Sequence, residues 1–291
     1  MEKCFLLQVH RDTEKISILV DSIISQGGDV FIHVDYKSPD VYFELKEKYG
    51  RTESVYFATE RKSVYWGAVS QVQATLSLLQ TAISKKRYDY YTLLSGECFP
   101  IKTMVQFNQF LEVNNGRSFI NNSLSESSRL RAEQYHFFIN SNLYSIPFFR
   151  LMSKLIRHTV GVLGLKNNAL RGMACYKGSQ WFTMHSSAVE YILEHGFELL
   201  SKLRFSSCID EVFFQTILAN SPLKNFIINN NLMYTLWSTS NLNHPRLLSV
   251  NDLKQLEEQD IYFARKMDLV NDKATYNYLI SMGIIPVTTK K

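Results

Sequence analysis

Apolar strands and amphipathic helices alternate in the first third of the chain, and this alternation limits the folds available to it. Short apolar runs indicate strands at 4–9, 27–35, 54–58 and 88–94. Apolar residues recur at helical spacing in 13–25 and 68–84. Units of strand, helix and strand build sheets with right-handed crossovers. The sequence therefore predicts an α/β fold, with helices flanking a mixed, mostly parallel central sheet.

The second half of the chain is less regular between residues 121 and 175, and regular patterns return at Tyr176. The elements predicted there are a helix from Pro147 to about Leu163, a strand at 177–184, helices at 186–196 and 210–222, a turn at 243–246, and helices near 250–257 and 272–282. Gly196 is expected to close one of these helices, and Asp210 is expected to open the next. No repeat or linker is evident, so we expect a single domain.

Charge and cysteine content exclude several classes of protein. The formal net charge is +5, and the basic runs are confined to 85–87 and 290–291, so nucleic-acid binding is not expected. The four cysteines are scattered without a CxxC pair, which indicates reduced thiols. No apolar stretch approaches the roughly 20 residues of a membrane span, and the N-terminal stretch does not resemble a signal peptide. These features favour a cytoplasmic protein; contact with the inner face of a membrane remains open.

The ends of the predicted strands are the candidate ligand sites, because α/β sheets bind ligands outside the carboxyl ends of their strands. These ends are Val9–His10, Val34–Asp35 and Ser95–Gly96–Glu97. Glycine-rich phosphate loops, a GxSxG elbow and an HExxH pair are all missing from the sequence. His10 and His33 are each interpreted first as structural residues.

A single acid follows the strand at 88–94. Nucleotide-sugar transferases of the common α/β type usually carry Asp-x-Asp there, and the paired carboxylates hold a divalent ion against the diphosphate. This chain has Ser95–Gly96–Glu97–Cys98 instead. One carboxylate cannot make that clamp, so other groups would have to neutralise a bound diphosphate.

Seven motifs, in this order and spacing, resemble one known family. They are FLLQVHRDTEKISILVDSI, FIHVDYKS, VYWGAVSQVQATLSLL, YDYYTLLSGECFPIKT, GSQWFTM, IDEVFFQTIL and YFARKMD. The chain is similar to the core-2/I-branching glycosyltransferases, a group of branching β-1,6-N-acetylglucosaminyltransferases and peptide O-xylosyltransferases. The resemblance implies a GT-A-like domain that works without a metal ion. Its nucleotide-binding half would be 1–120, and its acceptor and catalytic half would be 121–291.

The resemblance also assigns the donor site. The uridine and ribose pocket would be lined by Val9, His10, Asp35 and Trp66. The diphosphate would meet basic residues of the C-terminal region, namely Arg246, Lys266 and the adjacent Arg265. Their charge would take over the work of the metal on the leaving nucleotide. Core packing for Trp66 and a salt bridge for Arg265 are the alternatives.

Glu211, within IDEVFF, matches the catalytic base of the family. An inverting transfer is a one-step displacement, so a single carboxylate is enough to take the proton of the acceptor hydroxyl. The alternative is that Glu211 only favours the positive N-terminus of a helix. Asp210 is interpreted as the cap of that helix.

The acceptor side is assigned to the tip of the strand at 88–94 and to two later positions. Its members are Ser95, Gly96, Glu97, Trp181 and Asp210. Relatives commonly carry an aspartate where this chain has Cys98. Either Glu97 replaces that acid, or the loop meets a different acceptor.

The expected function is a metal-independent, inverting transfer from a UDP-sugar, with N-acetylglucosamine as the first candidate sugar. The acceptor would be a glycan or a lipid-linked saccharide in bacterial surface polysaccharide or glycoconjugate synthesis, and no cofactor is expected. UDP-xylose, UDP-glucose and UDP-galactose are alternative donors. A non-catalytic nucleotide-sugar-binding module and a nucleotidyltransferase are the other classes considered. The sequence leaves the acceptor, the linkage and the oligomeric state open.

Overall fold

The computed structural model describes residues 1–237 and 245–287, and its centre is a seven-stranded sheet. The strand order is β10-β6-β9-β4-β1-β2-β3. The bounds are β1 Lys3–Val9, β2 Asp29–Val34, β3 Val55–Phe57, β4 Tyr90–Ser95, β6 Ser118–Ile120, β9 Phe182–His185 and β10 Ile227–Ile228. Only β9 runs antiparallel to its neighbours β4 and β6, and the other pairs are parallel. The predicted mixed, mostly parallel sheet is confirmed.

The strand register brings the predicted ligand-binding ends together. Val9 of β1 pairs with Val34 of β2, and Gln8 of β1 pairs with Ser95 of β4. Both neighbours of β1 are parallel to it, so the three carboxyl ends lie side by side at one edge of the sheet. The residues that follow these strands therefore face the same space.

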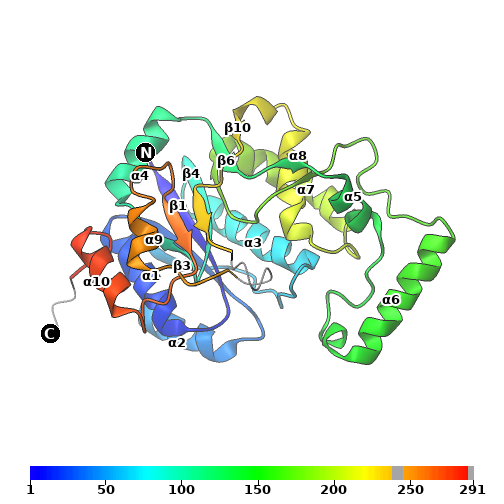
Figure 1. Cartoon of the computed structure of the whole chain (residues 1–291), viewed down its shortest axis with the longest axis horizontal. Helices are drawn as coiled ribbons and strands as arrows, with labels where there is room; N and C mark the ends of the chain where they lie inside the picture. Colours follow the sequence, from blue (N-terminus) through cyan, green and yellow to red (C-terminus); the bar gives the residue numbers. More distant parts are fainter. Residues whose placement is uncertain (238–244, 288–291) are drawn as a thin grey trace.

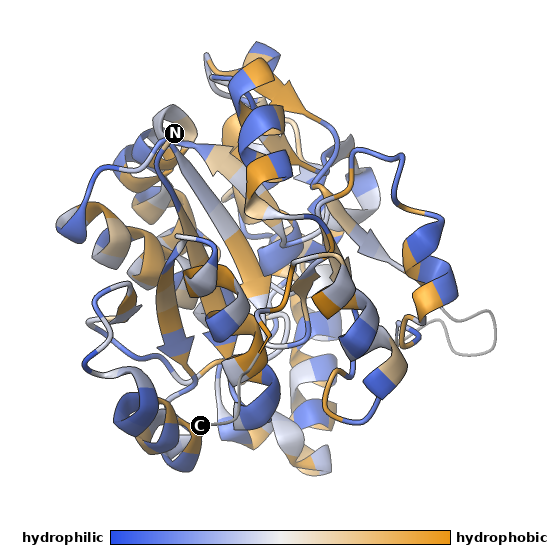
Figure 2. Ribbon diagram, turned by 90° about the vertical axis from the view of Figure 1, so that its left-hand side faces the viewer, coloured by the Kyte–Doolittle hydropathy of each residue, from blue (hydrophilic) through white to orange (hydrophobic). Residues whose placement is uncertain are grey.

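Helices flank the sheet on both sides (Figure 1). α1 (Thr13–Ser25) and α2 (Pro39–Tyr49) follow β1 and β2 and pack against each other. α3 (Val69–Lys85) crosses back to β4 and packs against α7 (Ser186–Lys202). From β1 to β3 the chain moves across the sheet in one direction, and from β3 to β4 it moves in the opposite direction. Because crossovers between parallel strands are right-handed, α3 lies on the face opposite α1 and α2. Figure 2 shows apolar residues along the central strands and on the helix sides that face them.

A small sheet of order β11-β12-β5 lies beside the end of β4. It consists of β11 Met233–Thr235, β12 Phe263–Arg265 and β5 Phe99–Pro100. β5 follows the tip of β4 directly and pairs antiparallel with β12. This pairing brings the C-terminal basic segment to the strand end occupied by Glu97.

The remaining elements complete the chain. They are β7 Ser123–Leu124, β8 Tyr176–Lys177, α4 Met104–Val113, α5 Glu126–Glu133, α6 Pro147–Val162, α8 Phe213–Ala219, α9 Val250–Lys254, α10 Lys273–Ser281 and the short 3₁₀ helices η1 Asn142–Ser145, η2 Ile209–Glu211 and η3 Lys224–Phe226. Residues 243 and 244 of the predicted turn at 243–246 lie outside the described residues. Among the described residues, no helix is both long enough and apolar enough to cross a bilayer.

Two predicted helix boundaries were wrong. α7 continues through Gly196, where an added Cβ would lie 3.0 Å from Cζ of Phe213. This glycine therefore permits close packing instead of ending the helix. Asp210 does not open α8 as its cap: it lies in η2, and α8 begins only at Phe213.

Candidate active site

Asp35 lies at the predicted uridine edge of the sheet and ties three segments together. Its backbone N–H donates to the carbonyl of Val9 at 2.9 Å. Its carboxylate Oδ1 accepts from the backbone N–H of Lys37 at 2.9 Å and of Val64 at 3.3 Å. These bonds hold the loop that carries Trp66 next to the ends of β1 and β2. The side chain of Trp66 is 84% exposed there, so it is not a core residue.

Arg61 was missed by sequence reasoning, and it fixes the same strand end. Its guanidinium donates to the carbonyl of Val34 at 3.0 Å and to that of Asp35 at 2.9 Å. His33 is buried, and its Nε2 accepts from the backbone N–H of Lys62 at 2.9 Å. Burial lowers the pKa of His33 to about 4, so its ring is neutral at pH 7. This geometry supports the structural interpretation of His33, whereas His10 is exposed at the end of β1.

Glu97 lies at the tip of β4 among three cationic side chains. Its carboxylate is 3.0 Å from Arg11 Nη2, 3.2 Å from Lys266 Nζ and 3.7 Å from Arg265 Nη2. The side chains of Arg265 and Lys266 are about one-fifth exposed, and that of Glu97 is one-quarter exposed. Burial acts to raise the pKa of Glu97, but Lys266 and Arg11 outweigh it, and the pKa falls below its ordinary value. We call Arg11, Glu97, Arg265 and Lys266 the cation cluster.

The residues on either side of Glu97 are packed inward. An added Cβ at Gly96 would lie 3.0 Å from Cγ1 of Ile16 and 3.5 Å from Cγ1 of Val9, so the tip of β4 sits closely on α1 and β1. Cys98 is buried, with Sγ 3.2 Å from Oγ of Ser95. Burial raises the pKa of the Cys98 thiol. A neutral, buried thiol cannot do the work of an exposed acid, so Glu97 is the only acid at this tip.

Trp181 is buried beneath the cation cluster. The guanidinium of Arg265 lies 5.2 Å from the centre of its ring system, a distance at which a cation is attracted to the ring face. The side chain is only 5% exposed. Trp181 therefore belongs to the hydrophobic core and also contacts Arg265 of the cation cluster.

The residues before Trp181 connect this cluster to Glu211. Lys177 places Nζ 3.2 Å from Oε2 of Glu211, and the backbone N–H of Gly178 donates to the carbonyl of Glu211 at 2.9 Å. Buried Gln215 donates to the carbonyl of Ser179 at 2.7 Å. The loop from Lys177 to Trp181 thus contacts the carboxylate of Glu211 at one end and the cation cluster at the other.

Asp210 and Glu211 differ strongly in environment. Burial, reinforced by the neighbouring charge of Glu211, raises the pKa of Asp210 to about 7. The side chain of Glu211 is 40% exposed and faces Lys177. Near pH 7, about half of the Asp210 carboxyls therefore keep their proton.

The segment before this pair is attached to the loop of Trp66. Cys208 has the left-handed backbone angle φ = 57°, and its N–H donates to the carbonyl of Gly67. Gly67 also has a positive φ, of 70°. A Cβ atom added to Gly67 would lie 3.4 Å from the backbone nitrogen of Cys208. This contact brings Trp66 and Glu211 to the same side of the fold.

Arg246 is the predicted donor residue that is least integrated with the others. Its guanidinium pairs with Asp252 at 2.7 Å. Its segment does run beside the cation cluster, since the N–H of Leu248 donates to the carbonyl of Lys266 at 2.9 Å. The backbone therefore places Arg246 near Lys266, while the side chain turns toward α9.

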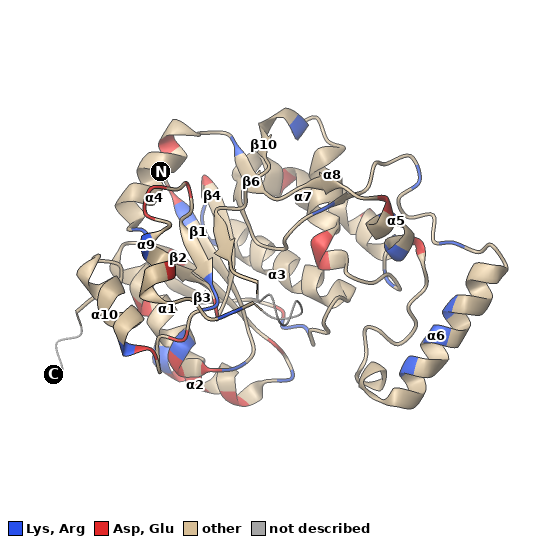
Figure 3. Cartoon of the chain, viewed as in Figure 1, with Lys and Arg blue, Asp and Glu red and all other residues tan. Residues whose placement is uncertain are grey.

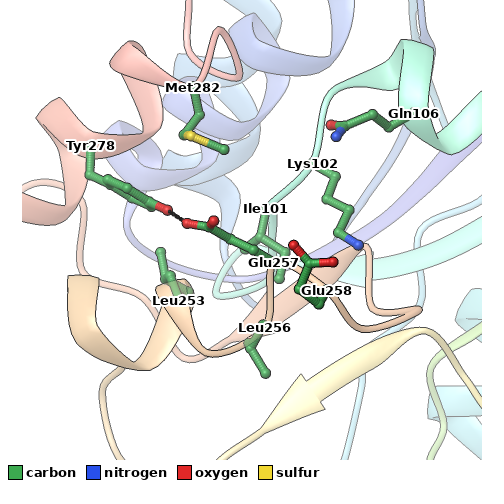
Figure 4. Close-up of a pocket in the computed structure, with 9 residues that line it drawn as sticks. All are labelled: Ile101, Lys102, Gln106, Leu253, Leu256, Glu257, Glu258, Tyr278 and Met282. Carbon is green, nitrogen blue, oxygen red and sulfur yellow. Dashed lines mark hydrogen bonds between the residues drawn. The ribbon is translucent and has the colours of Figure 1, made fainter.

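Sequence reasoning missed Lys177 and Arg11, both of which complete a charged pair of the site. Lys177 lies one residue before the GSQWFTM motif. Arg11 lies within the first motif, two residues after the end of β1, but no role was assigned to it. A cavity of about 190 Å³ lies outside the candidate site, between α4, α9 and α10. Lys102, Glu257 and Tyr278 are among the residues that line it (Figure 4). No predicted site residue lines it.

Within residues 1–237 and 245–287, no three His, Cys, Asp or Glu side chains converge as a metal site would require.

Replacing Asp210 with asparagine is expected to change the pH dependence of stability. The folded protein keeps the proton of Asp210 up to about pH 7, whereas an unperturbed aspartate releases it near 3.8. Between these values the unfolded state binds fewer protons, so the native protein loses stability as the pH rises. At about 1.4 kcal/mol per pH unit, the loss is on the order of 4 kcal/mol.

Asp210→Asn removes this loss, so the variant should be more stable than the native protein at pH 8, by an amount that shrinks toward pH 4. Urea unfolding at both pH values measures the difference, and Asp260→Asn, at an exposed position, is the control. Identical pH profiles for the native protein and Asp210→Asn would show that Asp210 ionises normally.

Comparison with known proteins identifies similar sequences over most of the chain. The model of the core-2/I-branching enzyme family matches residues 4–261. Xylosyltransferase 2 of Rattus norvegicus is 26% identical over 241 residues, which cover 80% of this chain and 26% of that protein. Xylosyltransferase oxt of Drosophila pseudoobscura pseudoobscura is 24% identical over 300 residues, which cover 93% of this chain and 32% of that protein. The chain spans about a quarter to a third of the length of these relatives.

The matches among solved structures are distant. The 4-diphosphocytidyl-2C-methyl-D-erythritolsynthase of Anaerococcus prevotii is 8% identical and aligns with a TM-score of 0.31. The alignment covers 69% of this chain and 80% of that one.

Proposed function

The chain belongs to the core-2/I-branching enzyme family, and from this premise we propose that it is an inverting glycosyltransferase that uses a UDP-sugar without a metal ion. The relatives that it matches are named xylosyltransferases, which supports sugar transfer as the reaction class. The proposal assigns the donor diphosphate to the cation cluster and the base to Glu211.

The cation cluster is the observation that carries the proposal. Three cationic side chains surround one carboxylate at the carboxyl end of β4, so positive charge exceeds negative charge by two. A leaving UDP develops negative charge on its diphosphate, and charge-assisted hydrogen bonds from Arg265 and Lys266 would stabilise it. Glu97 holds these cations in position in the absence of donor.

Glu211 is proposed as the general base. The acceptor hydroxyl oxygen attacks the anomeric carbon and forms the new glycosidic bond while the bond to the UDP oxygen breaks. Glu211 takes the hydroxyl proton, and the bonding electrons leave with UDP. Lys177 Nζ lies 3.2 Å from the carboxylate of Glu211 and would hold it in position. Below about pH 7 most Asp210 carboxyls keep their proton and cannot act as the base.

The nucleoside is assigned to the edge formed by Asp35 and Trp66. The exposed indole of Trp66 offers a flat face on which a uracil ring could stack. The Oδ2 atom of Asp35, which faces Lys37 at 3.6 Å, would accept from a ribose hydroxyl. Val9 and His10 lie beside this edge at the end of β1.

The transferred sugar is a finer part of the proposal. N-acetylglucosamine follows from the motif resemblance, and xylose is the second candidate because the named relatives are xylosyltransferases. UDP-glucose and UDP-galactose are the remaining enzymatic alternatives. We also propose a glycan or lipid-linked acceptor, in surface polysaccharide or glycoconjugate synthesis, and a cytoplasmic location. The four free cysteines support that location.

A donor screen tests this proposal. UDP-N-acetylglucosamine, UDP-xylose, UDP-glucose and UDP-galactose are each mixed with the protein, and the melting temperature and the release of UDP are recorded. We expect UDP and one UDP-sugar to raise the melting temperature, and that sugar nucleotide to be hydrolysed slowly in place of transfer. ADP-sugars serve as the control. Stabilisation without any turnover would favour the non-catalytic binding module, and no stabilisation by any uridine nucleotide would exclude the donor site.

A further inference from the structure

Helix α6 lies at the end of the molecule opposite α10, away from the central sheet (Figure 1). Its 16 residues make it roughly 24 Å long. Only Ser153 of this helix is fully buried. The helix therefore presents most of its surface outward.

The outward surface carries an apolar stripe. Phe148, Leu151 and Leu155 are spaced by three and four residues, so they lie on one face of the helix. Their exposed fractions are 63%, 56% and 58%. Exposed large hydrophobic side chains continue on both sides of these three: Leu143, Ile146, Val162, Leu163 and Leu165. Single exposed apolar residues need no explanation, but a contiguous group of this kind marks an interaction surface.

The inner face of α6 already has its partners. The ring of Phe149 packs against Phe138 with centroids 5.3 Å apart, and Arg157 lies 3.0 Å from Nδ1 of His136. These contacts hold the helix onto the preceding segment. The apolar stripe is a separate surface that no part of residues 1–237 and 245–287 covers.

The charge around the stripe is of one sign. Residues 134–189 contain no Asp or Glu and six cationic residues: Arg150, Lys154, Arg157, Lys166, Arg171 and Lys177. The rest of the chain holds the other 26 Lys and Arg and all 27 Asp and Glu, so the excess positive charge of the protein belongs to this segment. Arg150, Lys154 and His158 are spaced by four residues and border the stripe. Figure 3 shows basic and no acidic residues on α6.

We infer that α6 and the apolar residues flanking it, 143–165, dock onto a membrane surface rich in anionic phospholipid. A helix with a broad apolar face and a basic border lies in the plane of such an interface, with its apolar side chains among the acyl chains and its cations at the phosphates. A second copy of the chain is a poorer occupant, because it would place one basic border against another. The inference does not depend on the proposed transfer reaction.

Vesicle binding tests the inference. The protein is sedimented with phosphatidylcholine vesicles and with vesicles that also contain phosphatidylglycerol, at low and high sodium chloride. Each cation near an anionic surface contributes roughly fivefold to partitioning, so binding should be at least tenfold stronger to the phosphatidylglycerol vesicles. High salt should remove most of this difference, since it screens the attraction.

A matched pair of variants separates the stripe from general stickiness. Leu151→Glu combined with Leu155→Glu places two charges in the stripe and should abolish sedimentation with vesicles. Val105→Glu combined with Val113→Glu changes two exposed apolar residues of α4 and should leave binding intact. Equal melting temperatures show that both variants are folded.

Three outcomes would overturn the inference. The native protein could fail to bind the phosphatidylglycerol vesicles, or the α6 variant could bind them as well as the native protein does. In the third, the native protein is a dimer in lipid-free gel filtration and the α6 variant is a monomer, which would make this face a contact between copies.

Discussion

Replacing Glu211 with glutamine is expected to lower the turnover number by about 10²- to 10⁴-fold, the range that positioned general bases contribute. Glutamine keeps the size of the side chain and its hydrogen-bonding shape but cannot take the proton of the acceptor hydroxyl. Donor affinity should hardly change, because the lost interaction acts on the acceptor during attack. The measurement is steady-state transfer with the donor found in the screen, together with UDP binding.

A matched control separates a base from an ordinary ion-paired glutamate. Glu198 pairs with Lys202 at 2.6 Å on the exposed side of α7, much as Glu211 pairs with Lys177. Glu198→Gln should leave the turnover number unchanged. Asp210→Asn should keep most of the activity at pH 6, where the native carboxyl is largely protonated. Near-normal turnover in a folded Glu211→Gln protein would remove Glu211 from the mechanism and make Asp210 or Glu97 the next base to test.

Replacing Lys266 with alanine is expected to weaken UDP binding by about 10- to 150-fold. This range corresponds to the roughly 1.5–3 kcal/mol of a hydrogen bond to a charged group. The loss of UDP affinity should be larger than the loss on replacing a surface cation, because Lys266 is only 21% exposed and lies beside Arg265. Calorimetric titration of UDP measures it.

Lys48 of α2 supplies the control for Lys266. Its Nζ pairs with Asp21 of α1 at 3.1 Å, outside the proposed site. Lys48→Ala should bind UDP as the native protein does. An unchanged dissociation constant in a folded Lys266→Ala protein would show that Lys266 is only a structural partner of Glu97.

The central sheet could be predicted because its signals are local. β1, β2 and β4 are short apolar runs, and α1 and α3 show helical spacing of apolar residues. These patterns decide which face of an element is buried, and that choice determines how strands and helices stack. The meeting of Asp35 and Glu97 at one sheet edge follows from strand direction alone.

The boundary at Asp210 could not be predicted because a tertiary contact sets it. Cys208 takes a left-handed backbone conformation that a sequence reader expects of glycine or asparagine. Its hydrogen bond to Gly67 stabilises that conformation from outside the segment. The helix consequently starts at Phe213, and Asp210 becomes a partly buried carboxyl with a raised pKa instead of a cap.

The charged pairs of the site were unpredictable for a related reason. Lys177 meets Glu211, and Arg11 meets Glu97, across long stretches of sequence. Composition and spacing mark such residues only as ordinary surface cations. Likewise, the strand predicted at 177–184 is divided into β8 and β9, and Trp181 lies in the loop between them. Its stacking under Arg265 depends on the pairing of β5 with β12.

Titrating UDP into EDTA-treated protein decides whether cationic side chains do the work of a metal at this site. Arg265 and Lys266 supply two positive charges beside Glu97, so UDP should bind with the same dissociation constant in EDTA as in excess magnesium or manganese. Binding that is absent in EDTA and restored by either metal would contradict the assignment of the diphosphate to the cation cluster.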